Sequence, residues 1–221
     1  MSWLDFFHFG QSKTVAKSPV VPACHCLFNA TGTVLIVQHQ NTTELLSEAA
    51  QALLFSAQAG LATILRALST TLNPLTNQPY SIFNYHALQL LLSQGGRYIP
   101  VYANEVSIAH CQFQAQQHGD IATTLLGYPL TDAELPFAAG LMSRFANSAK
   151  QMQQYQHPQL RKACHAILCL EVLNGAPSVS LLLLSLDVQQ HQQHLAQLPC
   201  HKSSNHCPDW QVRKEVYSFV G

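Results

Sequence analysis

The C-terminal part of the chain constrains the fold most, because its apolar residues follow the patterns of β-strands. Ser178 to Val188 holds five Leu and two Val, and Lys162 to Leu173 is similarly apolar. Val212 to Val220 alternates, which places Arg213, Glu215, Tyr217 and Phe219 on one face. We expect three strands here, with the first two joined at the turn-forming residues 174–177 by a loop longer than a minimal two-residue hairpin.

Helical patterns accompany these strands. Thr131 with Glu134 forms a capping box, and apolar residues then recur at helical spacing as far as Met152. Gln189 to Leu198 is predicted as a short helix or turn. Residues 131–221 are therefore predicted to form a helix–strand–strand–helix–strand unit around a small sheet.

The preceding part, residues 23–130, is predicted as a helix-rich α+β domain with short strands. Residues 23–38 carry two apolar runs with turn-forming residues between them, which predicts a hairpin. Asn41 with Glu44 predicts a helix start, Gly60 a helix end, and Leu61 begins a second helical stripe.

Three more elements are expected before residue 130. Residues 84–93 predict a helix that stops at Gly95-Gly96. Residues 97–103 predict a strand, in which Pro100 requires an edge position or a bulge. Residues 105–118 predict a further helix. The fold class of the whole chain is thus α+β.

Residues 1–22 are predicted to be an aromatic N-terminal segment followed by a linker. Trp3, Phe6 and Phe7 could dock on the body of the protein, or contact a partner or a membrane surface peripherally. No basic region or small-residue cleavage site marks a secretory signal, and no run of about 18 apolar residues marks a transmembrane helix.

Charge excludes some partners. Eleven basic and eleven acidic residues give a formal net charge of +0, and charged residues make up only 10% of the chain. No Lys/Arg run exists, so nucleic-acid binding is not expected. The near-zero charge weakens repulsion between copies, so a protein partner or a homodimer is expected.

Cysteine and histidine occur together. Six of the seven cysteines have a histidine as a direct neighbour. The odd count and the lack of an export signal predict reduced thiols in a cytoplasmic protein. Thiolate and imidazole are also ligands of transition metals.

The strongest metal candidate is the loop from Pro199 to Pro208. It contains Cys200, His201, His206 and Cys207, a Cys₂His₂ set that tetrahedral zinc could bind. A disulfide between Cys200 and Cys207 and a plain polar loop are the other interpretations, because six residues separate the cysteines instead of the usual two to four.

The sequence contains no complete catalytic signature. Cys164, His165 and Cys169 are interpreted as core residues of a strand, and His110-Cys111 similarly. The acidic residues Asp132, Glu134, Glu171 and Asp187 fit capping, strand-end and surface positions. A Cys-dependent hydrolase or transferase stays as a third hypothesis, since a Cys/His pair can be assembled by the fold.

Several segments resemble the bacterial enhanced-serine-sensitivity (SseB-like) family. They are His157–Ala163, Cys164–Val172, Ser180–Val188 and Glu215–Phe219 in the C-terminal half, with fainter similarity in Tyr85–Leu92 and Gly96–Ala103. Cys164-His165 stands where the family has an aromatic and an apolar residue. The resemblance implies a bacterial, non-catalytic accessory protein and transfers no active-site residues. Our leading hypothesis is therefore an interaction protein, with a zinc-binding protein as the alternative.

Overall fold

A computed structural model describes most of the chain's sheet and the helices on it. The described residues are 23–29, 32–38, 46–108, 123–128, 130, 140–141, 144, 147–149, 151–152, 157, 160–189 and 210–221. The N-terminal aromatic segment, the cap residues Asn41, Glu44, Thr131 and Glu134, and the pair His110-Cys111 lie outside them. The same is true of most of the short helix predicted over residues 189–198.

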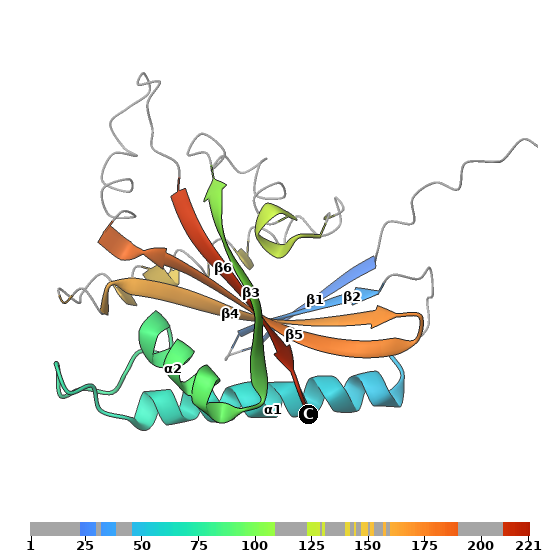
Figure 1. Ribbon diagram of the computed structural model, residues 1–221, viewed down its shortest axis with the longest axis horizontal. Helices are drawn as coiled ribbons and strands as arrows, with labels where there is room; N and C mark the ends of the chain where they lie inside the picture. The colour runs from blue at the N-terminus through green and yellow to red at the C-terminus, as the bar shows by residue number, and fades with distance from the viewer. Residues whose placement is uncertain are drawn as a thin grey trace, which may run out of the picture.

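Six strands form one sheet. They are β1 (Ala23–Asn29), β2 (Gly32–Gln38), β3 (Tyr98–Ile108), β4 (Lys162–Leu173), β5 (Ala176–Asp187) and β6 (Trp210–Phe219). Their spatial order is β1-β2-β4-β5-β6-β3, and every neighbouring pair is antiparallel except β2 and β4, which are parallel. With two helices on one side of the sheet, the α+β class is confirmed (Figure 1).

The three C-terminal strands form as their patterns predict, but the sheet is larger than the small one expected. β1 and β2, the predicted hairpin, extend it through the β2–β4 pair, and β3 extends it at the other edge. Strands from both sides of the boundary predicted at residue 130 therefore share one hydrogen-bonded sheet.

The turn between β4 and β5 is shorter than predicted. Leu173 pairs with Ala176, so Asn174 and Gly175 alone connect the two strands. Both have positive φ, 52° and 79°, which is the backbone that a two-residue type I′ hairpin requires. An Asn-Gly pair adopts this conformation at low cost, and this explains why the minimal loop forms.

Both faces of the central strands are buried. One face contributes Ile167, Leu182 and Val212 to a core that also contains Leu125, Leu141 and Met152 from the segment between β3 and β4. The other face contributes residues such as Leu168, Leu183 and Tyr217 to a second core beneath the two helices. Each face therefore packs its own layer onto the shared strands β4, β5 and β6.

Helix α1 (Glu48–Thr70) starts later and runs further than predicted. Ser47 caps it, accepting a hydrogen bond from the Ala50 N–H at 3.2 Å. Gly60 does not end it, because this buried glycine lies inside a continuous apolar face. A Cβ at Gly60 would lie 3.7 Å from both Arg97 Cδ and Tyr98 Oη, which is an ordinary van der Waals contact, so the start of β3 packs beside α1 without requiring a glycine here.

Among the described residues, α1 is the one helix that has the length and composition of a membrane span. A third of its most apolar window, 33%, is buried within the protein, and Leu54, Leu61 and Leu65 lie in the second core. The prediction that the chain has no transmembrane helix was based only on uninterrupted runs of apolar residues. Helix α1 has no such run, but its average composition is apolar enough to qualify as a candidate.

Helix α2 (Tyr85–Gly95) matches the prediction for residues 84–93. The Asn84 side chain caps it by accepting a hydrogen bond from Ala87 N–H at 2.9 Å, and Gly96 ends it with φ 67°. A β-bridge between Asn84 and Ala163 and a bond from Cys164 N–H to Phe83 O hold the start of α2 against β4.

Strand β3 confirms one expectation and corrects another. It is an edge strand, and its register shifts between Pro100 and Tyr102, so both outcomes expected of Pro100 occur. The strand also continues to Ile108, so a helix does not begin at Glu105. Pairing with β6 as far as Trp210 outweighs the helical pattern there.

Candidate functional site

The predicted zinc residues Cys200, His201, His206 and Cys207 lie outside the described residues. Within the described ranges no group of three His, Cys, Asp or Glu side chains could hold a metal ion. The zinc site in the Pro199–Pro208 loop thus stays a prediction.

The Cys/His group of β4 is part of the core, as predicted. Cys164 and Cys169 are 1% and 0% exposed, and they belong to the cores on opposite faces of the sheet. Burial raises the pKa of the Cys164 thiol, which disfavours the thiolate. Burial, with the nearby Arg144 charge, lowers the pKa of His165 to about 4 and keeps its imidazole neutral at pH 7.

The carboxylates Glu171 and Asp187 lie at opposite ends of the β4–β5 ladder, as the strand-end interpretation expects. Glu171 pairs with Ser178 near the turn and accepts a hydrogen bond from the Tyr128 hydroxyl, whereas Asp187 pairs with Lys162. They are too far apart to work as an acid/base pair.

A buried polar group among the described residues is centred on Glu215, and no sequence motif pointed to it. Glu215 as a whole residue is 3% exposed. It accepts hydrogen bonds from the Tyr85 hydroxyl at 2.6 Å, the Tyr217 hydroxyl at 2.8 Å and Arg213 Nε at 2.6 Å. Gln89 Nε2 is a more distant donor at 3.4 Å. We call these five residues the Glu215 centre.

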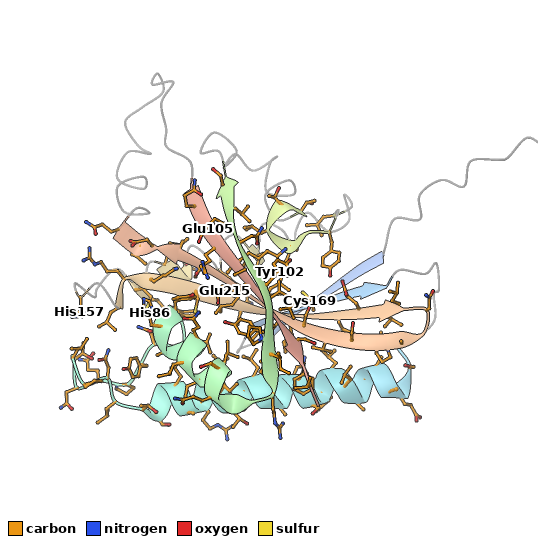
Figure 2. The ribbon with its side chains drawn as sticks, viewed as in Figure 1. His86, Tyr102, Glu105, His157, Cys169 and Glu215 are labelled. Carbon is orange, nitrogen blue, oxygen red and sulfur yellow. The ribbon has the colours of Figure 1, made fainter. Side chains whose placement is uncertain are left out.

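Two elements, β6 and α2, build the Glu215 centre. Alternation along β6 places Arg213, Glu215 and Tyr217 on the face that packs under the helices. The first turn of α2 supplies Tyr85, and Gln89 follows one turn later on the same side of the helix. Figure 2 labels Glu215 on β6 and His86 at the start of α2.

The electrostatics of the Glu215 centre favour a permanent carboxylate. Burial alone would raise the pKa of Glu215, but hydrogen bonds from Tyr85, Arg213 and Tyr217 outweigh it and lower this pKa. Burial and the bond to Glu215 raise the pKa values of Tyr85 and Tyr217, so both phenols stay protonated. The carboxylate, the phenols and the Arg213 guanidinium therefore do not titrate near pH 7.

Two further titratable side chains, Lys162 and His86, flank Tyr85. Lys162 Nζ lies 4.3 Å from the centroid of the Tyr85 ring, and the His86 ring meets it edge-on with centroids 5.1 Å apart. Burial, and then the positive charge of Arg213, lower the pKa of Lys162. Burial and the charge of Lys162 lower that of His86. The Glu215 centre and its neighbours thus join α2 to β4 and β6.

A second polar contact fixes the opposite face of β6. The buried Lys214 donates from Nζ to the carbonyl of Leu126 at 3.0 Å, at the end of the short helical turn 123–126. Burial lowers the pKa of Lys214. The Glu215 centre thus holds α2 against one face of β6, and the Lys214 bond holds the helical turn 123–126 against the other face.

The most exposed strand among those with described side chains is β3. All residues from Ile99 to Glu105 are exposed, including Ile99 at 49%, Val101 at 61% and Tyr102 at 50%. β6 lies on one side of β3, and none of the described strands pairs with its other side (Figure 1). We call this side the β3 edge.

The ladder fixes which backbone groups of β3 point to this edge. Val220 N–H donates to Arg97 O at 2.8 Å, so alternate β6 residues from 220 down to 210 direct their backbone groups toward β3. Their partners after the register shift are Tyr102, Asn104 and Val106. The N–H and C=O groups of Ala103 and Glu105 therefore point to the β3 edge.

Pro100 fits the same alternation. Its backbone nitrogen also points away from β6, which is the orientation in which a strand tolerates proline. The proline thus predicted the edge position of β3 from the sequence. The exposure of both faces of β3 had no comparable signal, because it depends on which elements cover the sheet.

Comparison with known proteins adds no family to these observations. No protein-family model matches the chain, and no curated protein matches it at a significant level. The resemblance to the SseB-like family therefore rests on the sequence segments quoted above.

Proposed function

We propose that this protein is a non-catalytic accessory protein that binds another protein chain along the β3 edge. The observation that carries the proposal is an edge strand of 11 residues in which all residues from Ile99 to Glu105 are exposed, with apolar side chains among them. Addition of a strand to such an edge is a common mode of protein recognition, in which main-chain hydrogen bonds supply affinity.

The chemistry of the β3 edge supports a protein ligand. Ala103 and Glu105 offer backbone donors and acceptors, and Val101 and Tyr102 offer apolar surface beside them. An added strand would form hydrogen bonds with the backbone groups of Ala103 and Glu105, and its side chains would cover those of Val101 and Tyr102. Small polar ligands would leave the apolar side chains in water.

The Glu215 centre supports a non-catalytic role. Its carboxylate is bound by three close donors from the protein itself, and its pKa shifts move the carboxylate and both phenols away from proton transfer at neutral pH. A group poised for acid–base catalysis would show the opposite shifts.

Photo-crosslinking tests the proposal. A benzophenone amino acid replaces Val101 at the β3 edge, and in the control protein it replaces Leu173 at the β4–β5 turn. The two sites are matched, since both are apolar and their exposures are 61% and 60%. Irradiation in the producing cell should link the Val101 protein to one defined chain, which mass spectrometry of the adduct identifies.

The Leu173 protein should give no such adduct. If the two proteins give the same adducts in the same yield, the β3 edge is not a binding surface and the proposal is wrong.

A further inference from the structure

We propose that the chain bound at the β3 edge is a second copy of this protein, paired antiparallel to β3 about a two-fold axis at Asn104. The inference rests on the proposed function and names its partner. It follows from the backbone directions, the side-chain pattern and the charges of residues 102–106.

Backbone directions restrict the register. In a symmetric antiparallel pair, residues that point to the β3 edge must meet residues that do the same. A two-fold axis at Asn104 sets Ala103 opposite the partner's Glu105, and these two residues exchange both N–H···O=C bonds. Asn104 then faces the partner's Asn104 in a pair without hydrogen bonds, where Cα atoms approach to about 4.5 Å.

The side chains favour the same axis. It sets the half-exposed Tyr102 opposite the partner's Val106, twice in the dimer. An aromatic ring against a β-branched side chain is a stabilising cross-strand pair. Val106 packs against the core that contains Val212, so it offers a fixed surface to the ring.

The charge of Glu105 favours a two-fold axis at Asn104 over an axis one residue further along, at Glu105. The regular part of β3 runs from Tyr102 to Ile108, and an axis at its midpoint would oppose two Glu105 carboxylates. The axis at Asn104 sets each Glu105 against an alanine instead. Arg213 lies 3.3 Å from Glu105 in the same chain, and the formal net charge of +0 adds no general repulsion between copies.

The paired segment is short, so the dimer is expected to be weak and dependent on concentration. A single pair of short strands buries less surface than the interface of an obligate dimer. Covalent trapping is therefore a more suitable test than the mass at a single dilution.

Asn104→Cys tests the register. At the axis, two cysteines would have the Cα separation that a disulfide needs. Mild oxidation of the full chain at high concentration should convert Asn104→Cys to a covalent dimer, well above the wild-type background from the native cysteines. Leu173→Cys is the matched control, because this residue is 60% exposed and lies at the β4–β5 turn, away from the β3 edge.

Ala103→Pro in the Asn104→Cys protein tests the hydrogen bonds. It removes an N–H that points to the β3 edge and leaves the bonds to β6 in place. Two bonds per dimer are lost, so the yield of covalent dimer should fall about tenfold. Circular dichroism and the melting temperature verify that the fold is kept.

The outcomes separate the two proposals. Equal dimer yields from Asn104→Cys and Leu173→Cys would show that the second copy, in this register, is wrong. If the Val101 crosslink then contains a different protein, the proposed function holds with another partner. If Val101 and Leu173 give the same adducts, both proposals fail.

Discussion

Glu215 illustrates how a single buried residue joins segments that are distant in the sequence. Alternation along β6 predicts that it shares a face with Arg213 and Tyr217, and the structure confirms this. The sequence could not reveal its partner Tyr85, which is 130 positions away. Because β6 is buried on both faces, the pattern also did not show which of its polar residues needed partners.

Glu215→Gln should make the protein less stable at neutral pH by about 1–3 kcal/mol, because a charged acceptor of three hydrogen bonds becomes neutral. The folded state lowers the pKa of Glu215 below its ordinary value of 4.5. Its stabilising contribution is therefore present above about pH 4.5 and is lost as the pH falls through the folded-state pKa. Urea unfolding from pH 7 to pH 3 should show the wild type and the variant converging in acid.

Glu105→Gln is the matched control, since Glu105 contacts the same Arg213 but its side chain is 54% exposed. Its cost should be at most about 1 kcal/mol. An equal loss from the two substitutions, or a Glu215→Gln deficit that does not change with pH, would contradict the role assigned to the Glu215 carboxylate.

At the scale of elements, local signals were reliable where tertiary pairing agreed with them. The Asn84 cap, the Gly96 stop and the edge position of β3 each follow from one residue's backbone chemistry. The expected helix over residues 105–118 was wrong at its start, because β6 pairs with β3 as far as Ile108. A helical pattern contains no information about a partner strand.

The two-residue turn between β4 and β5 makes a prediction of its own. Gly175→Ala should destabilise the protein by about 1–2 kcal/mol, because φ at this position is 79° and a Cβ disfavours the left-handed region. The free energy of unfolding from urea titration measures the effect.

Gly95→Ala is the control for this substitution, because Gly95 is helical and its added Cβ would lie 3.9 Å from Ile64 Cδ1. It should be neutral or mildly stabilising. If Gly175→Ala is equally harmless, the backbone of the turn does not require glycine.

At the scale of the whole molecule, the strands β4, β5 and β6 serve both cores. The apolar patterns predicted these three strands, but we also predicted a domain boundary at residue 130, because the helix-rich part of the chain precedes the strand-rich part. The parallel pair of β2 with β4 and the antiparallel pair of β3 with β6 cross that boundary. Such long-range pairings leave no local trace from which a single sequence could predict them.

A shared sheet predicts one cooperative unfolding transition, and two native thiols can report on it. Cys164 lies in the core under α1 and α2, and Cys169 lies in the core on the other face. Both are buried, so neither should react with iodoacetamide in the folded protein. With increasing urea both should become reactive at one midpoint, which pulsed alkylation and fragment mass spectrometry can resolve for each thiol. Two separate midpoints would show that the layers unfold independently and that the shared strands do not couple them.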